Sequence, residues 1–185
     1  LGLHYSVHGT GADHCSGVMD DGLPGMMEDW ESLNVAERIP TSELSPRKTR
    51  MAYELGLCKA LPNHLGLCGF VPWNFSEVME GVRAITGWKI EAWKLMKVVE
   101  RGITLMRIFN LREGFTREDD RLPDRFSSLP ETGPLKELRV DPAVLRESQE
   151  IYYQLMAWEI NGVPTRGCLV GLDMDWAWPY LQRGH

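Results

Sequence analysis

The chain has 185 residues and a mass of 21.1 kDa, a length that favours one domain and permits two small ones. Hydrophobic residues make up 43% of the sequence and charged residues 25%, which excludes wholesale disorder, a collagen helix and a coiled-coil rod. The formal net charge of −6 opposes contact with phosphate backbones, so we expect no nucleic-acid partner. No run of about 18 apolar residues occurs, which argues against a membrane span.

The N-terminus has neither a basic stretch nor an apolar signal core, and the chain does not begin with Met. We therefore expect it to be the interior of a longer protein. The cysteines are Cys15, Cys58, Cys68 and Cys168, widely spread in a chain that is large enough to fold without disulfides. This usage favours a reduced, cytoplasmic protein.

The first confident helix signal lies in the second quarter of the chain. Residues 9–25 are rich in turn formers and are expected to be loop, and residues 26–44 have only weak periodicity. Ser45 is a good N-cap and Pro46 suits the first helical position, so a helix should begin there. Pro62 is expected to break it.

Two further helices are predicted in the middle of the chain. Asn74 followed by Glu77 resembles a capping box, and the helix that it opens should end at Gly87. Apolar residues in steps of three and four predict a longer helix over about 90–111, whose wide apolar stripe indicates that most of it is buried. Gly102 inside this helix indicates close backbone packing.

The last third of the chain begins with a long irregular segment. Residues 114–141 hold several turn formers and prolines, and a helix is then expected from Pro142 to about Trp158. Thr165 should cap a last short helix through Leu172. Since no alternating strand pattern is convincing, the predicted fold class is mainly α, an irregular helical domain with long loops.

Residues 63–68, with the sequence NHLGLC, are the strongest local candidate for chemistry. A helix stop, a glycine that permits a tight turn and a thiol follow one another directly. A thiolate is a ligand for zinc and for iron–sulfur clusters. The alternative is that Cys68 is a small buried apolar residue, as free cysteine often is. One cysteine cannot hold a cluster, so other ligands of any metal would lie outside this chain.

A glycine-rich loop that ends in Asp13, His14 and Cys15 is the second candidate. Histidine is the side chain best suited to act as acid or base near neutral pH, which makes His14 the candidate in this loop. Adjacent loop residues point in different directions, so we do not expect these three residues to form a protease-like site. A loop histidine with a structural hydrogen bond is the alternative.

Residues 112–125 interleave arginines with carboxylates, which is typical of a solvated face or of ion pairs. We expect these arginines to have a structural role, holding loops by bidentate bonds. Motifs of nucleotide-binding proteins, serine hydrolases and zinc proteases are absent.

Several of these segments together resemble the C-terminal region of the tungsten-containing aldehyde ferredoxin oxidoreductase family. The similarity lies in residues 2–14, LGLCGF at 65–70, TGW at 86–88, the Arg-rich run at 102–126 and the tail at 152–172. It covers nearly the whole chain.

The resemblance implies that residues 1–185 form a single C-terminal helical domain of a larger multidomain oxidoreductase. Residues 1–44 would be a loop-rich segment that faces cofactor and substrate, and residues 45–185 the helical body. Family members hold tungsten or molybdenum between two pterins, beside a [4Fe-4S] cluster. Three cluster cysteines lie upstream in the family, so both cofactors would be completed by residues outside this chain.

The family's remaining cluster cysteine closes a motif Asp-x-x-Gly-Leu-Cys. The resemblance therefore assigns Cys68 as a metal ligand and places Gly66 and Leu67 in the same cofactor-binding motif. The motif's aspartate binds pterin amino groups, and its position here is Asn63, which keeps an acceptor oxygen and loses the charge.

The same resemblance assigns His14 as the catalytic histidine near metal and substrate, whereas Thr10 stands where the family has arginine. It implies oxidation of an aldehyde to a carboxylic acid, with electrons passing through the cluster to ferredoxin. The implied partners are the remaining N-terminal domains, ferredoxin and a small aldehyde or acyl substrate; a homo-oligomer is left open. Two alternatives are a family branch that reduces an aromatic acyl-CoA, and a non-catalytic helical interaction domain.

Overall fold

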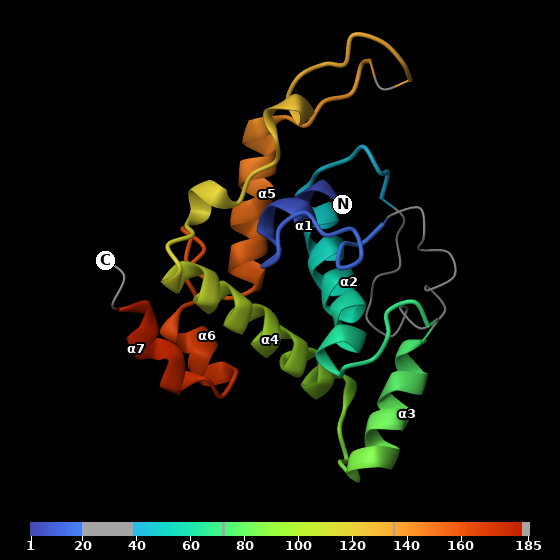
Figure 1. The fold of residues 1–185 in the computed structure, drawn as a ribbon, viewed down its shortest axis with the longest axis vertical. Coiled ribbons are helices and arrows are strands. Elements are labelled where there is room, and N and C mark those ends of the chain that lie inside the picture. Colours follow the sequence, from blue (N-terminus) through green and yellow to red (C-terminus); the bar gives the residue numbers. More distant parts are fainter. Residues whose placement is uncertain (20–38, 72, 135, 183–185) are drawn as a thin grey trace.

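The computed structural model describes residues 1–19, 39–71, 73–134 and 136–182, which form a helical assembly (Figure 1). Its helices are α1 (Gly2–Val7), α2 (Pro46–His64), α3 (Phe75–Thr86), α4 (Ala92–Arg112), α5 (Pro142–Leu155), α6 (Arg166–Gly171) and α7 (Trp178–Leu181), with 3-10 turns η4 (Arg117–Asp119), η5 (Asp124–Phe126) and η6 (Asp175–Ala177). Within these residues the only β pairing is an isolated bridge between Trp158 and Pro164. The predicted mainly α class is confirmed.

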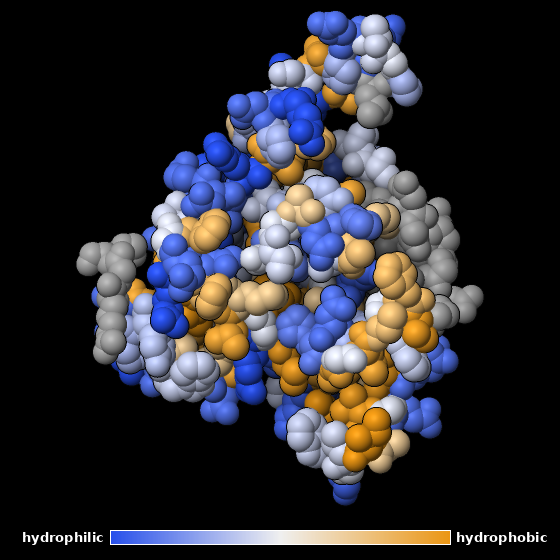
Figure 2. Space-filling view, in the orientation of Figure 1, coloured by the Kyte–Doolittle hydropathy of each residue, from blue (hydrophilic) through white to orange (hydrophobic). Residues whose placement is uncertain are grey.

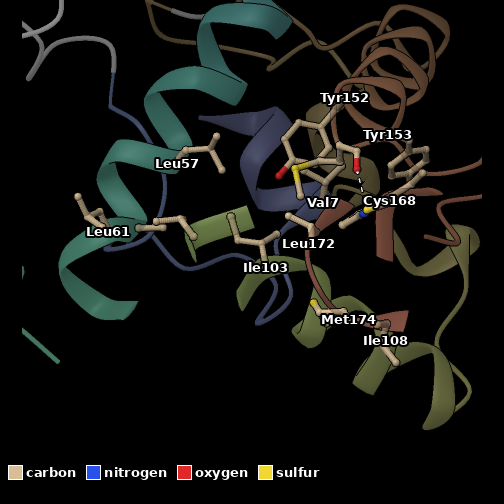
Figure 3. Close-up of a cluster of buried hydrophobic side chains, with 14 of the residues drawn as sticks. Val7, Leu57, Leu61, Ile103, Ile108, Tyr152, Tyr153, Cys168, Leu172 and Met174 are labelled. Carbon is tan, nitrogen blue, oxygen red and sulfur yellow. Dashed lines mark hydrogen bonds between the residues drawn. The ribbon is translucent and has the colours of Figure 1, made fainter. Parts of the chain in front are cut away.

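The hydrophobic core lies where α2 packs against both α4 and α5. Figure 3 shows Leu57 and Leu61 of α2, Ile103 of α4, and Tyr152 and Tyr153 of α5 contributing to one buried cluster. Burial of each such side chain contributes about 1.5–3 kcal/mol, so this junction of three helices supplies much of the driving force for folding.

The helix starts agree with the local sequence signals. The Ser45 hydroxyl accepts from the Lys48 N–H at 3.3 Å at the start of α2. Asn74 and Glu77 form a complete capping box at α3, which ends at Gly87 in the left-handed conformation. At α6 the Thr165 hydroxyl accepts from the Cys168 N–H at 2.9 Å. These predicted caps are confirmed, because a cap depends on only a few neighbouring residues.

The expectation that Pro62 breaks the second helix is wrong. Helix α2 continues through Pro62 to His64. A proline in the last turn removes one intrahelical hydrogen bond, to the carbonyl four residues earlier, and the turn that follows supplies others. The helix ends at His64 with Leu65 as its C-cap, and Gly66, whose φ is +71°, then turns the chain away.

Helix α4 is less buried than its apolar stripe predicts. Trp93, Leu105 and Phe109 are exposed, while Leu95 and Val99 are buried. The expectation that most of this helix is buried is therefore wrong, since the other described helices cover one face of it. The close packing predicted at Gly102 is confirmed: a Cβ there would overlap the ring of His64.

Two short helices escaped prediction, α1 at the N-terminus and α7 near the C-terminus. Their lengths of 6 and 4 residues are too short for a periodic signal. Helix α5 also ends at Leu155, before Trp158, and Ala157 follows with φ +55°. Most of the predicted weakly periodic segment 26–44 lies outside the described residues. No helix in the described part of the chain is both long and apolar enough to cross a membrane.

A buried ion pair between Arg107 and Asp120 joins α4 to the segment that follows it. Two guanidinium nitrogens each lie 2.8 Å from a carboxylate oxygen, and both side chains are nearly inaccessible to solvent. The third nitrogen, Nε, donates to the carbonyl of Gly162 at 2.8 Å, and the Tyr153 hydroxyl donates to the Asp120 carboxylate. Arg107 also lies over the Tyr153 and Trp158 rings, 5.7 Å from each centroid.

The structural role predicted for the Arg-rich segment is confirmed at one of its arginines. Arg117 donates to the carboxylate of Glu150 on α5 and to the carbonyl of Ile160 at 2.9 Å. Arg112 is exposed and lies over the Tyr180 ring, 5.0 Å from the centroid. The strongest bidentate bond is made by Arg107, which lies just before the interleaved run.

We predict that Asp120→Ala destabilises the chain by about 3–5 kcal/mol, because it leaves the Arg107 charge buried without its partner. Urea unfolding followed by far-UV circular dichroism measures the change. Asp175→Ala is the control, since it removes the exposed pair with Arg166 and should change the free energy of unfolding by less than about 0.5 kcal/mol. Equal losses in the two variants would contradict the proposed role of the buried pair.

Candidate functional site

The turn that carries Cys68 is the C-terminal stop of α2. Gly66 adopts the left-handed conformation, its N–H donates to the Asn63 carbonyl at 3.2 Å, and the Leu67 N–H donates to the Pro62 carbonyl at 2.8 Å. This pair of bonds is the Schellman motif, which needs a residue with positive φ at its centre. Gly66 is therefore required by the backbone, whatever else it contacts.

Leu67 fixes the direction in which the chain leaves this turn. Its side chain is half-buried and packs against the main core, whereas Cys68, one residue later, is exposed. A short turn follows, in which the Val71 N–H donates to the Cys68 carbonyl at 3.2 Å. Glycine, leucine and cysteine thus act in sequence: the first turns the chain, the second anchors it and the third presents a thiol to the surface.

The four thiols fall into two classes. Cys58 lies with Sγ 4.0 Å from the Met96 sulfur, and burial raises the pKa of its thiol to about 12. Burial also raises the pKa of Cys168, whose thiol donates to the Met156 carbonyl at 3.4 Å. Cys15 and Cys68 are exposed. Cys15 and Cys68 are therefore the thiols that a surface-bound group could reach without a change in the fold.

Asn63 lies on the same turn as Cys68. Its side chain is exposed, and its Oδ1 lies 3.8 Å from the position that a Cβ on Gly69 would take. The amide therefore lies over the backbone directly after Cys68. It offers one acceptor and two donors beside this backbone, without a charge.

His14 lies in a loop held by its neighbours. The Asp13 carboxylate accepts from the Cys15 N–H at 2.9 Å and from the Ser16 hydroxyl at 2.7 Å, and these bonds lower the pKa of Asp13. His14 is exposed, with Nε2 3.6 Å from the Cys15 sulfur.

The expectation that these three side chains diverge is wrong. One ligand atom from each of Asp13, His14 and Cys15 lies within 4.8 Å of the others, because the bonds to Asp13 fold the loop. Both Asp13 oxygens are already occupied, and no hydrogen bond joins Asp13 to His14 among the described contacts. The arrangement is therefore not a charge-relay triad.

Helix α4 brings the histidine loop and the cysteine turn together. Gly102 allows the His64 ring to lie against the helix, and a Cβ on Gly9 would lie 2.9 Å from the Met106 Cβ. Asn110 donates to the Gly9 carbonyl at 2.7 Å. Positions 102, 106 and 110 lie on one stripe of a helix. One face of α4 therefore carries both segments.

His8 and His64 are site residues that the sequence analysis missed. His8 is half-buried, with Nδ1 2.9 Å from the Thr10 hydroxyl. Burial lowers its pKa most strongly, the Asp13 carboxylate raises it, and the His64 imidazole lowers it again. His8 is thus electrostatically coupled to both segments. No motif could have revealed this, because His8 and His64 are 56 positions apart in sequence.

Comparison with known proteins identifies the family. A family model for the aldehyde ferredoxin oxidoreductase, domains 2 and 3, matches residues 1–174. The chain belongs to the aldehyde ferredoxin oxidoreductase family. It is 28% identical over 166 residues to the tungsten-containing aldehyde ferredoxin oxidoreductases of Thermococcus kodakarensis and Pyrococcus furiosus. The resemblance noted in the sequence is confirmed.

These alignments cover 87% of this chain and 26% of each relative, so the chain spans about a quarter of the length of the curated family members that it matches. The fold is also similar to a solved structure, the active site complex BamBC of benzoyl coenzyme A reductase in complex with 1,5-dienoyl-CoA. That comparison gives a TM-score of 0.60 at 22% identity and covers 80% of this chain and 23% of the other. It shows a shared fold.

We predict that a short pulse of iodoacetamide at pH 8 alkylates Cys15 and Cys68 and spares Cys58 and Cys168. A thiol with a pKa of about 12 is ionised on the order of one part in 10⁴ at that pH, and burial also blocks the reagent. Peptide mass spectrometry measures the labelling, and a sample unfolded in urea is the control in which all four should react. Labelling of Cys58 as fast as Cys68 in the native chain would contradict the two classes.

Proposed function

We propose that this chain is the C-terminal part of a larger tungsten or molybdenum pterin oxidoreductase. The proposed enzyme oxidises an aldehyde to a carboxylic acid and passes the electrons through a [4Fe-4S] cluster to ferredoxin. The observation that carries the proposal is the exposed Cys68 thiol, held on the turn that ends α2. The resemblance assigns this position to a cluster cysteine. Family membership and the tungsten in the relatives' names support it.

The cysteine turn fits one corner of a cluster. A [4Fe-4S] cluster takes four thiolates, and Cys68 offers one that is accessible and lies beyond a rigid helix end. The other three would come from outside this chain. When bound, the cluster supplies one-electron transfer to and from the pterin-held metal. The contribution of Gly66 and Leu67 is then to fix where the Cys68 sulfur lies.

Asn63 would hold a pterin by hydrogen bonds of a neutral amide. Its Oδ1 can accept from an amino group, as the family's aspartate does, and its Nδ2 can donate. A hydrogen bond to a neutral acceptor contributes about 0.5–1.5 kcal/mol, compared with about 1.5–3 kcal/mol for a charged one. We therefore propose that the pterin contact persists in weaker form.

His14 is the residue that we propose acts on the substrate. Its exposed ring can donate a hydrogen bond to a substrate oxygen or transfer a proton. The hydrogen bonds to Asp13 hold the backbone of the loop on either side of His14, which restricts where its ring can lie. The proposed roles of His14 and Cys68 require two segments of this chain to face the same cofactor, and their shared support on α4 is consistent with this.

Reduction of an aromatic acyl-CoA is the second candidate. It is favoured by Thr10 and Asn63, which replace the charged residues of the aldehyde-oxidising pattern, and the BamBC likeness is compatible with it through the fold alone. A non-catalytic interaction domain is a third. Metal content of the purified longer enzyme separates the third candidate from the others, and substrate assays separate the first two.

We predict that Cys68→Ala in the longer enzyme removes or destabilises the cluster, since it takes away one of four thiolates. Iron analysis and the EPR signal of the reduced cluster measure the loss. Cys15→Ala is the matched control, because Cys15 is the other exposed thiol, and Cys168→Ala controls for a buried one. Both controls should keep iron near the wild-type content. An unchanged cluster signal in the Cys68 variant would contradict the assignment, and a wild type without iron would favour the non-catalytic domain.

We predict that His14→Ala lowers kcat/KM by roughly 10²–10⁴-fold while the metal and pterin content stay near wild type, as for a positioned acid or base. Viologen-coupled aldehyde oxidation measures this, with an aromatic acyl-CoA as the competing substrate. His14→Asn should recover part of the loss if hydrogen bonding matters most. His8→Asn is the comparison within the same loop; an equal loss there would assign the effect to loop folding.

A further inference from the structure

A run of exposed large apolar side chains begins two residues after Cys68. It comprises Phe70, Val71, Trp73, Ile85, Trp88 and Trp93, which we call the aromatic patch. Phe70 is 89% exposed, Ile85 87% and Trp88 60%. Exposed apolar surfaces of this kind mark interaction sites more often than isolated exposed residues do. Tryptophan in particular is enriched among the side chains that dominate binding energy.

Helix α3, which carries part of the aromatic patch, packs against the rest of the described chain along one side. It has 12 residues, and Val78 is the one that is buried. Figure 1 shows it lying apart from the junction of α2, α4 and α5, and Figure 2 shows hydrophobic residues gathered over it and the segment before it. Isolated helices of about 12–15 residues are marginal in water. Its capping box and the Arg83 bond to the Ile90 carbonyl, at 2.8 Å, hold its ends. Its apolar side packs against the main core through Phe75, Val78, Met79 and Val82, whereas Ile85 near its C-terminal end stays exposed.

We propose that the aromatic patch is the docking surface for the part of the longer enzyme that supplies the other three cluster ligands. This inference rests on the proposed function, because it takes Cys68 as a cluster ligand. Thiolates that share a cluster with Cys68 must approach it within a few ångströms. The segment that bears them must then pass over the surface beside Cys68, and Phe70 and Val71 lie two and three residues away. The relatives' length leaves ample chain for this, since the alignment covers 26% of each.

The chemistry of the patch favours a permanent partner over a transient electron carrier. Obligate interfaces are more hydrophobic than transient ones, and weak electron-transfer contacts are small. The charges within residues 74–94 balance: Glu77, Glu80 and Glu91 oppose Arg83, Lys89 and Lys94. A charged carrier protein is guided by a field of one sign, which this surface does not offer.

Hydroxyl-radical footprinting with mass spectrometry tests the proposal on the 185-residue chain and on the longer enzyme. Phe70, Ile85 and Trp88 should be oxidised in the 185-residue chain and strongly protected in the longer enzyme. Equal oxidation in both would overturn the proposal. Protection that disappears on dilution would indicate a second copy of the enzyme, and protection that appears only on adding ferredoxin would indicate the electron carrier; either result would overturn the occupant proposed here.

A matched pair of variants tests the consequence for the cluster. Trp88→Ser in the longer enzyme should weaken the packing of the docked segment by about 30-fold or more, the loss expected for an interface tryptophan, and lower the iron content. Trp176→Ser is the control, because Trp176 is 61% exposed and lies in η6, which contacts α6 and α7. Figure 1 shows α6 and α7 well away from α3. Circular dichroism of the 185-residue chain checks that both variants fold.

The outcomes separate the two proposals. Loss of iron in Cys68→Ala with full iron and unchanged footprints in Trp88→Ser would keep the proposed function and overturn the docking surface. Full iron in Cys68→Ala would overturn the proposed function, whereas the footprints would still report whether the patch is covered. Equal iron loss in Trp88→Ser and Trp176→Ser would overturn the docking surface, because the effect would then not be specific to the patch.

Discussion

The close approach of His64 to helix α4 is the constraint on which the candidate site depends. At Gly102 any side chain would overlap the imidazole, so glycine is required for the end of α2 to lie against α4. One and two turns further along, Met106 and Asn110 contact Gly9. The spacing of these contacts along α4 fixes the position of the histidine loop relative to the cysteine turn. A larger residue at position 102 would displace the turn, and with it the Cys68 sulfur.

The motifs that identify the family turn out to be structural. The Arg-rich run supplies Arg107 and Asp120, and the tail supplies Tyr153 and Gly162, and all four meet in one buried network. A Cβ on Gly162 would overlap the Arg107 guanidinium, so the tail can wrap around that side chain only with glycine there. Family membership therefore follows from residues that build the fold, and it does not by itself fix the reaction.

A structural feature could be predicted from the sequence when the residues that determine it lie close together along the chain. The caps at Ser45, Asn74 and Thr165 were predictable because their partners are within three residues. The end of α2 was mispredicted because the last turn of the helix accommodates Pro62, and the left-handed Gly66 four residues later turns the chain away. Exposure of Leu105 could not be predicted, since it depends on which neighbours cover each face of α4. The proximity of His8 to His64 is likewise set by long-range packing, so it left no signal in sequence spacing.

The two departures from the family pattern, Thr10 and Asn63, lie beside the coupled histidines His8 and His64. By the resemblance noted in the sequence, Thr10 stands where the family pattern has a cation, and Asn63 where it has an anion. The Thr10 hydroxyl contacts His8, and Asn63 precedes His64, so the two positions adjoin the coupled histidines. Removing one member of a charge pair leaves the other uncompensated at high cost, whereas removing both is often nearly neutral. The two substitutions remove opposite charges and leave the formal charge at these positions unchanged. The His8 imidazole, whose pKa burial lowers, therefore has the neutral Thr10 hydroxyl as its hydrogen-bond partner, and the Asp13 carboxylate is the ion that acts on it.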